Sequence, residues 1–556
     1  MSASTFDLEV IKDCIVAVGD EMFEAVIRTS MSPIIYETTD FAVGATDARG
    51  NLLAQGNGVT AFLATLDTAV QDLLKHYPNP GEIAPGDAFI TNSPYSGGGT
   101  HLSDVVIIVP VFHQDRLIAF TVNKAHWTEV GGSQPGSVST ESTEIYQEGL
   151  HFRFLKLYSK GVLNDSLVQL IRDNVRLPDS TIGDMHSGVA AARVGAARIQ
   201  ELADKYGTNL VLSAMEDLLD YGERMTLEEI RKLPKGRYEA EDVVEGDGLG
   251  NGPFTVRCAV TIGDDEIVAD FTGTSEQAAG PINCAYTGLI TGARCLFKAI
   301  TNTEIPANGG CFRALKVICP QGTVISAVSP APVSLYYESL IAAIDVMWKA
   351  LASVLPDRLS AGHQRTVGAN FISGNHPDTD ELFVLGQPLV GGWGASADLD
   401  GDNGQFCCGN GETFNIPVEL FETRYGLQVE RYAFHDEAGG EGQYRGGRGV
   451  VLDYRVMSDE VFLTYAASRT SVRPWAINNG VEGTHNYAKV IRSSGDEERY
   501  SMCTMVRADK GECIRLVSAT GGGYGSPNKR RAELIEQDIR NGFLSPQRAK
   551  EVYAYG

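Results

Sequence analysis

Basic residues are few for a chain of this length, and their shortage excludes several classes of function. Lysine and arginine number 46 among 556 residues, against 71 aspartates and glutamates, so the formal net charge is −25 at pH 7. Proteins that bind nucleic acid or an anionic membrane surface take most of their affinity from Lys and Arg. We therefore expect no nucleic acid and no membrane among the partners, and the composition favours a cytoplasmic enzyme.

Several common motifs are also missing. The sequence holds no C-x-x-C pair, no G-x-S-x-G nucleophile elbow and no glycine-rich loop followed by Lys-Ser/Thr. These absences argue against a paired-cysteine zinc or redox site, an elbow-type serine hydrolase and a phosphate loop for ATP. The ten cysteines are typical of reduced residues in cytosolic cores. Adjacent Cys407 and Cys408 leave a pair of metal ligands as the alternative.

The apolar and turn patterns predict an α+β, multidomain fold with mixed and antiparallel sheets. Acidic residues interrupt the apolar positions near the N-terminus, which predicts an amphipathic helix rather than a signal peptide or a membrane span. Residues 237–330 are expected to form strands, and a strong helix should follow from Tyr336. Four consecutive regions are expected: an N-terminal α/β metal-binding region (1–236), a central strand-rich region with one long helix (237–364), a Gly-rich β region (365–526) and a C-terminal helical tail (527–556).

Histidine is scarce, and two of the ten histidines flank a predicted hairpin. His101 follows three glycines and precedes Asp104 by three residues, and His126 comes 25 residues after His101. If Val105–Val111 and Leu117–Val122 pair antiparallel, the loops that carry these side chains lie at the same end of the hairpin. Two imidazoles and a carboxylate suit Zn, Mn, Co or Fe(II). An H-x-x-D pair at the start of a strand is also a common turn or capping device, and this stays the alternative.

The sequence resembles the hydantoinase B/oxoprolinase family. The resemblance is carried by "NSPYSGGGTHLSDVVIIVPVF", "HWTEVGGSQPGS", "NIPVELFETRYGLQVERYAF" and "GGGYGSP", and it covers essentially the whole chain. That family includes the second subunits of ATP-dependent hydantoinases and lactamases, the corresponding half of 5-oxoprolinase, and subunits of acetone and acetophenone carboxylases.

The resemblance implies a divalent metal site. His101, Asp104 and His126 stand at the positions of family ligands, and Asp40 in "YETTDFAVG" is the implied fourth ligand. Asp47 is a weaker candidate, because its D-A-R-G turn explains it structurally.

Other residues are assigned to roles beside the metal. Asp is common in the family at the positions that Ser93 and Glu129 occupy here. These two departures affect the surroundings of the metal ligands and the choice of substrate. The candidate general acids or bases are Glu148 and Glu129, and the candidate substrate-binding residues are Asn92, Tyr95 and Gly98.

The implied function is that of the metal-dependent catalytic subunit of an ATP-dependent cyclic amide hydrolase of the hydantoinase, 5-oxoprolinase or lactamase type. A hydantoinase A-type partner subunit would bind ATP and phosphorylate the ring amide, in a heterotetramer of two plus two subunits. The metal would be one Mn, Zn or Co ion per chain. The alternative within the family is a subunit of an ATP-dependent ketone carboxylase, which would use bicarbonate; a non-catalytic scaffold for the ATP-binding subunit is a further alternative.

Overall fold

The computed structural model of the protein describes residues 5–63 and 65–555, which form two compact units. Unit 1 holds the chain up to Arg237 together with Ala259–Tyr336 and Asn410–Phe414, and unit 2 holds Tyr238–Cys258, Tyr337–Gly409 and the chain from Asn415 onward. The α+β class with mixed and antiparallel sheets is confirmed. The four consecutive regions stay a prediction, because the compact units group the chain by contact in space rather than by sequence order.

A seven-stranded antiparallel sheet with the order β2-β1-β5-β4-β3-β6-β7 organises unit 1. Its strands are β1 (Phe41–Asp47), β2 (Leu52–Gln55), β3 (Ala88–Thr91), β4 (Asp104–His113), β5 (Arg116–His126), β6 (Leu155–Ser159) and β7 (Val162–Leu163).

The central pair of this sheet is the hairpin predicted from the sequence. β4 and β5 pair antiparallel from Asp104 opposite His126 to His113 opposite Arg116. On its other edge β5 pairs with β1, with Phe41 opposite Ala125. The start of β4, the end of β5 and the start of β1 therefore lie side by side.

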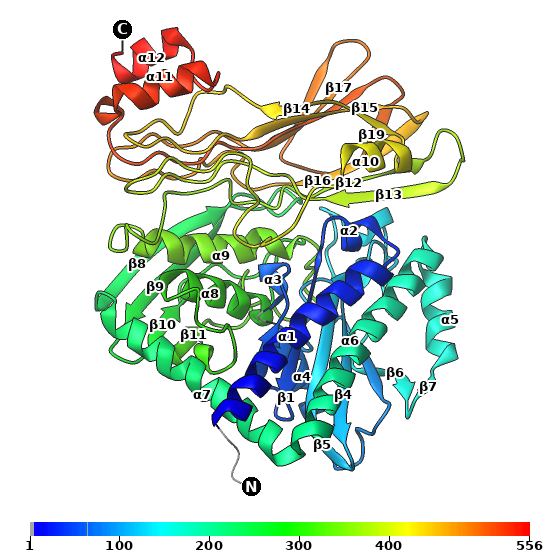
Figure 1. Cartoon of the computed structure of the whole chain (residues 1–556). Helices are drawn as coiled ribbons and strands as arrows, with labels where there is room; N and C mark the ends of the chain where they lie inside the picture. The colour runs from blue at the N-terminus through cyan, green and yellow to red at the C-terminus, as the bar shows by residue number, and fades with distance from the viewer. Residues whose placement is uncertain (1–4, 64, 556) are drawn as a thin grey trace. The chain divides into compact units, whose positions relative to one another are not determined.

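Helices cover both faces of the sheet. α1 (Thr5–Thr29) and α6 (Pro178–Tyr206) lie against each other, and α6 packs on β4 and β5 (Figure 1). Successive β5 side chains point to opposite faces. Thr121 accordingly bonds the Ala192 carbonyl of α6 at 2.7 Å, whereas Lys124 bonds Thr65 at the start of α4 (Leu66–His76).

The remaining helices of unit 1 agree with the sequence except in one place. The predicted helical stretch after residue 165 forms α5 (Asp165–Asn174), α6 and α7 (Thr208–Lys232), and shorter helices are α2 (Pro33–Tyr36) and α3 (Thr60–Leu63). The expectation of strands throughout 237–330 is wrong at α8 (Tyr286–Ile300). Its buried large or apolar side chains recur with helical spacing, and they include Leu289, Ala293, Leu296, Phe297 and Ile300.

Strands do form elsewhere in the 237–330 stretch, separated by loops. They make a four-stranded sheet with the order β11-β10-β9-β8, in which β10 and β11 are parallel. The strands are β8 (Gly236–Val244), β9 (Phe254–Ile262), β10 (Ile267–Asp270) and β11 (Leu315–Ile318).

Unit 2 contains the long predicted helix, α9 (Tyr336–Leu351), and two antiparallel sheets. The sheet orders are β13-β12-β16-β19 and β14-β15-β20-β17-β18, and both contribute to one apolar core. Their strands are β12 (Asn370–Asn375), β13 (Leu382–Gln387), β14 (Leu427–Phe434), β15 (Val450–Val456), β16 (Glu460–Ala466), β17 (Tyr487–Ile491), β18 (Glu497–Tyr500), β19 (Met502–Asp509) and β20 (Cys513–Val517). A short helix, α10 (Val418–Arg424), interrupts them, and the tail forms α11 (Ala532–Arg540) and α12 (Pro546–Tyr553) as predicted.

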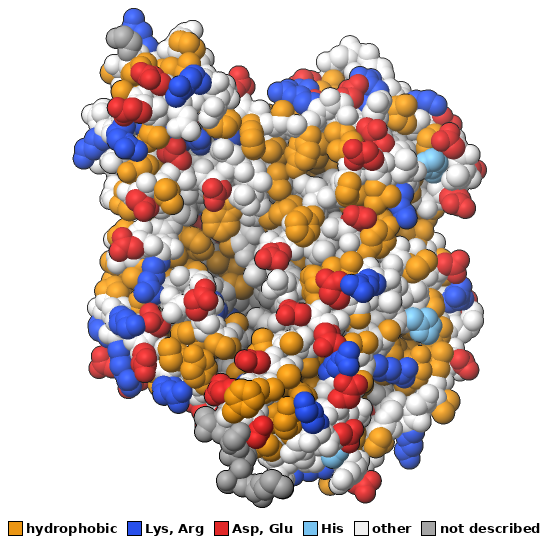
Figure 2. Space-filling view, viewed as in Figure 1, with side chains coloured by type: hydrophobic (Ala, Val, Ile, Leu, Met, Phe, Trp, Pro, Cys, Tyr) orange, Lys and Arg blue, Asp and Glu red, His pale blue; other side chains and the backbone are white. Residues whose placement is uncertain are grey.

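The surface carries charges of both signs. Acidic and basic side chains are interspersed over the face shown in Figure 2. No helix within the described ranges combines the length and the apolar character that crossing a membrane requires.

A buried ion pair joins two helices of unit 1 and predicts a large loss of stability. Both guanidinium Nη atoms of Arg294 on α8 lie 2.9 Å from the carboxylate of Asp67 on α4, and both side chains are largely buried. Substitution of Arg294→Met should lower the free energy of unfolding by about 3–5 kcal/mol, because it leaves a buried carboxylate without its counter-ion. The exposed Arg172–Asp179 pair supplies the control, since Asp179→Asn should cost at most about 1 kcal/mol. Equal shifts of the two variants in thermal unfolding would contradict the assignment.

Candidate metal centre

Three neighbouring strand ends bring the predicted metal ligands together. Asp104 is the first residue of β4 and His126 the last of β5, and the two are directly opposed. Asp40 immediately precedes β1, and its carbonyl accepts the backbone N–H of His126 at 3.0 Å. His101 lies in the loop that leads into β4, and the backbone N–H of Asp104 bonds its carbonyl at 3.2 Å. The structure therefore brings the side chains of His101, Asp104 and His126 together and places the backbone of Asp40 beside His126.

The distances suit a single ion. One ring nitrogen each from His101 and His126 and one carboxylate oxygen of Asp104 lie within 4.8 Å of one another, and all three residues are buried. Metal–nitrogen and metal–oxygen bonds of about 2.0–2.2 Å place the ligand atoms of one ion roughly 3–4 Å apart.

A backbone carbonyl fixes the tautomer of His101. Its Nδ1 lies 3.0 Å from the carbonyl oxygen of Ser334, which can only accept, so Nδ1 carries a proton. The other ring nitrogen, Nε2, lies 3.1 Å from Oδ1 of Asp104. In neutral His101 this nitrogen has a lone pair and no hydrogen to give, and Oδ1 then has no donor among the described residues. A lone pair beside a buried carboxylate oxygen is stable only with a cation between or beside them, which a second proton or a metal ion supplies.

The electrostatics of the group point the same way. Desolvation and the nearby Asp104 carboxylate raise the pKa of Asp40 to about 7. Burial and the neighbouring His101 lower the pKa of His126 to about 4, so this imidazole is neutral and able to bind a metal at physiological pH. Burial alone would lower the pKa of His101, but Asp104 outweighs it and raises that pKa. Two carboxylates and two imidazoles that shift one another's pKa values in this way suit the binding of a divalent cation.

A buried lysine that the sequence reasoning missed completes the charge balance. Nζ of Lys124 lies 2.9 Å from both the Gly98 carbonyl and the Thr100 hydroxyl, and Thr100 in turn donates a hydrogen bond to Asp104. Burial lowers the pKa of Lys124 to about 8. Lys124 stands two residues before His126 on the same face of β5, so a lysine within an apolar strand at that spacing was a signal in the sequence.

The two predicted acid–base residues are engaged in hydrogen bonds. Glu129 is buried, accepts backbone N–H groups of Gly131 and Gly136 at 2.9 and 2.8 Å, and pairs with Arg176 at 2.7 Å. Glu148 accepts the Ser142 hydroxyl at 2.8 Å and two backbone N–H groups of the loop that carries Ser334. These contacts are typical of carboxylates that hold loops in place, and the acid–base roles stay predictions.

The three predicted substrate-binding residues shape the glycine-rich loop. The amide of Asn92 bonds the carbonyls of Leu102 and Leu150 and accepts the Phe152 N–H, which ties the loop ends to the sheet. Tyr95 donates its hydroxyl hydrogen to the Ala331 carbonyl. Gly98 approaches α4 so closely that a Cβ would lie 2.7 Å from the Ala69 Cβ. Close packing therefore accounts for this glycine, and contact of the three residues with a substrate stays a prediction.

The other candidates raised by the sequence have structural explanations. Asp47 accepts the backbone N–H groups of Arg49 and Asn51 at 2.8 Å each, as expected for its turn. Cys407 and Cys408 form no disulfide, and neither does any other of the ten cysteines, all of which lie in the described ranges.

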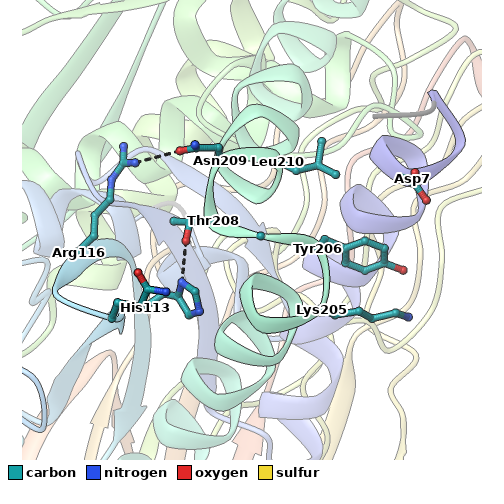
Figure 3. A pocket seen from close by; sticks show the side chains of 10 residues that line it. Asp7, His113, Arg116, Lys205, Tyr206, Thr208, Asn209 and Leu210 are labelled. Atoms are coloured by element: carbon teal, nitrogen blue, oxygen red, sulfur yellow. Dashed lines mark hydrogen bonds between the residues drawn. The ribbon is translucent and has the colours of Figure 1, made fainter. Parts of the chain in front are cut away.

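A pocket of about 790 Å³ lies at the opposite end of the β4–β5 hairpin (Figure 3). At its wall Nδ1 of His113 lies 2.6 Å from the hydroxyl of Thr208, and Arg116 bonds Asn209. Arg116 and His126 are the two ends of β5, and the ten residue steps between them span roughly 33 Å at about 3.3 Å per step. This pocket is therefore remote from the candidate metal centre.

Comparisons with known proteins place the chain in a family. It matches the family described as Hydantoinase B/oxoprolinase over residues 4–527. The chain belongs to this family, as the sequence motifs indicated.

Two relatives whose names describe enzyme subunits match nearly the whole chain. The chain is 31% identical to the B subunit of a putative D-/L-hydantoinase from Pseudomonas sp. (strain NS671), over 98% of this chain and 94% of the relative. It is 28% identical to the beta subunit of the caprolactamase of Pseudomonas jessenii, over 98% of this chain and 95% of the relative.

Solved structures share the fold. The crystal structure of the ATP-dependent caprolactamase from Pseudomonas jessenii matches with a TM-score of 0.92 and 27% identity, over 100% of this chain and 96% of that chain. A nucleotide-free acetone carboxylase matches with a TM-score of 0.90 over 99% of this chain and 79% of that chain, but at 18% identity this likeness shows the fold alone.

The tight fit of Gly98 gives a prediction with an internal control. Gly98 and Gly81 both adopt a left-handed backbone, with φ of +74° and +86°, but a Cβ on Gly81 would meet nothing within 4 Å. Gly81→Ala should lower stability by about 1–2 kcal/mol through backbone strain alone. Gly98→Ala should cost about 1–3 kcal/mol more, because its Cβ is forced against α4. Differential scanning calorimetry measures both, and equal losses would show that the close approach is relieved without cost.

Proposed function

We propose that this chain is the metal-dependent catalytic subunit of an ATP-dependent cyclic amide hydrolase. The observation that carries the proposal is the meeting of His101, Asp104 and His126 at adjacent strand ends, with Nε2 of His101 turned towards Asp104. Family membership supports the reaction class, since relatives above 25% identity are named for a hydantoinase and a caprolactamase.

The proposed ligands are Asp40, His101, Asp104 and His126, and the mixed nitrogen and oxygen donors suit Mn, Zn or Co. When bound, a divalent ion supplies a Lewis acid that polarises carbonyl or phosphoryl oxygens and lowers the pKa of water.

The chain's own residues prepare the site for this chemistry. His126 presents a neutral imidazole, and the carboxylates of Asp40 and Asp104 are desolvated, which makes their negative charge costly without a cation. Lys124 fixes the Gly98 carbonyl and, through Thr100, the orientation of Asp104. The site is thus held before the substrate arrives, which preserves the geometry that the reaction needs.

A separate partner supplies ATP in this proposal. The relatives named as the B subunit of a hydantoinase and the beta subunit of caprolactamase each match over nearly the whole of this chain, which supports a distinct ATP-binding partner of the hydantoinase A type. That partner would phosphorylate the ring amide, and ring opening would follow at the metal site of this chain. We propose a heterotetramer of two plus two subunits.

A ketone carboxylase that uses bicarbonate is the second candidate. It is supported by the shared fold with acetone carboxylase, to which identity is only 18%. The cyclic amide hydrolase is favoured because the relatives that are closer in sequence carry cyclic amide names.

Product analysis of the reconstituted complex tests the proposal. The chain with its ATP-binding partner is incubated with ATP and with hydantoin, 5-oxoproline, caprolactam or acetone, each with and without bicarbonate. We expect an opened ring from a cyclic amide without any need for bicarbonate, and no ATP hydrolysis by this chain alone. Carboxylation of acetone that depends on bicarbonate would favour the second candidate.

Two histidines of one hairpin provide the matched variants. His126→Ala should lower ring opening by at least about 100-fold, because a metal ligand is lost. His113→Ala, at the far end of the same two strands, should leave ring opening unchanged. Full activity of the His126→Ala complex would contradict the metal site.

A further inference from the structure

The loop Ala331–Ser334 holds the tautomer of a proposed ligand. The carbonyl of Ser334 accepts the Nδ1–H of His101 at 3.0 Å, and Ser334 is 1% exposed. The partner of the second ring nitrogen determines the orientation and basicity of a metal-binding histidine. Whatever fixes this carbonyl therefore fixes how His101 presents Nε2 to the site.

A single carboxylate accepts the backbone N–H groups of Val333 and Ser334 in this loop. Oε1 of Glu148 accepts the backbone N–H of Val333 at 3.0 Å and that of Ser334 at 2.9 Å, and Oε2 lies 3.1 Å from the Val333 nitrogen. The Ser142 hydroxyl donates to the same Oε1 at 2.8 Å. Glu148 is 3% exposed, so water does not compete effectively for these bonds.

Neutral groups engage two carbonyls of the loop and the Ser334 hydroxyl. Tyr95 donates to the Ala331 carbonyl, Asn283 donates to the Pro332 carbonyl at 3.0 Å, and the Ser334 hydroxyl donates to the Ser139 carbonyl at 2.7 Å. These contacts restrain the carbonyl side, and Glu148 restrains the amide side. Since the Ser334 N–H and C=O belong to consecutive peptide planes, a shift of the first turns the second.

We propose that Glu148 is a positioning residue for the metal centre, which acts through the Ala331–Ser334 loop on His101. The proposal rests on the metal site of the proposed function and assigns Glu148 a task other than proton transfer. Its oxygens are directed at loop donors, whereas a proton donor to substrate must reach the reacting atoms.

Cobalt titration of the metal-free chain tests this role without reference to activity. Co(II) binding is followed by visible absorption in the wild type, Glu148→Gln and Glu148→Asp. In Glu148→Gln an amide N–H₂ replaces Oε2, which sets a donor against the Val333 N–H and removes the negative charge that both loop N–H groups face. We expect the Kd of Glu148→Gln for Co(II) to rise by about tenfold or more and its cobalt spectrum to change, because loss of an outer-shell partner of a metal ligand typically has an effect of this size. Glu148→Asp keeps the charge but shortens the reach, so its Kd should fall between those of the wild type and Glu148→Gln.

Asp87→Asn is the matched control. Asp87 is a buried carboxylate of the same unit that accepts the backbone N–H groups of Ala84 and Lys160 at 2.9 and 2.8 Å and pairs with Lys156. Like Glu148, it accepts two backbone N–H groups, but it contacts neither the proposed ligands nor the Ala331–Ser334 loop, so the Kd of this variant for Co(II) should stay within twofold of the wild type. A thermal melt of each variant confirms that the chains compared are folded.

The possible outcomes distinguish failure of the positioning role from failure of the proposed function. A wild-type chain that binds no Co(II) would overturn the metal site, and the role of Glu148 with it. A wild type that binds Co(II), with folded Glu148 variants within twofold of its Kd, would overturn the positioning role alone. A comparable rise of the Kd in Asp87→Asn would also overturn it, because the effect would then reflect a general loss of stability.

Discussion

The antiparallel pairing of β4 with β5 is the constraint on which the candidate site depends. It sets Asp104 opposite His126, and the pairing of β5 with β1 adds Asp40 at the same edge of the sheet. Side chains alternate between the two faces of a strand, so a slip of one residue would turn either group away from the other. The apolar residues between these ends are buried on both faces, which makes such a slip costly. The hydrophobic effect along the hairpin thus determines the geometry of polar groups at its end.

The same edge gathers more charge than a protein interior usually holds. Asp104 and Lys124 are fully buried and joined through Thr100, and His101 lies against Asp104. Charges are removed from water at high cost unless they are paired and hydrogen-bonded. A divalent ion would pair with the carboxylates at this edge, and the surrounding loops hold the ligands in position for it.

Much of this arrangement follows from local sequence patterns. The α1 helix and the β4–β5 hairpin follow from apolar patterns and the β1–β2 turn from its D-A-R-G residues, each within one short stretch. The hairpin alone brings Asp104 to His126. The missed helix α8 contains glycine, threonine and other weak helix formers, so its helical spacing of buried residues was the better guide.

Other parts of the site lie beyond local patterns. Asp40 was identified through the family resemblance, because its approach to His126 depends on the pairing of β1 with β5. The hydrogen bond between His101 and Ser334 joins residues 233 positions apart in the sequence. Its acceptor is a backbone carbonyl, which every residue type possesses. No residue-type pattern reports such a contact. Lys124 is intermediate: its spacing from His126 was visible, but its partners Gly98 and Thr100 became apparent only in the folded chain.

Anomalous diffraction from crystals grown with Mn, Zn or Co tests the central claim most directly. Data collected at the absorption edge should show one strong peak per chain. The peak should lie about 2.0–2.2 Å from Nε2 of His101, a ring nitrogen of His126 and carboxylate oxygens of Asp40 and Asp104. A saturated crystal without a peak at these four residues, or with its peak at Cys407 and Cys408 instead, would contradict the account.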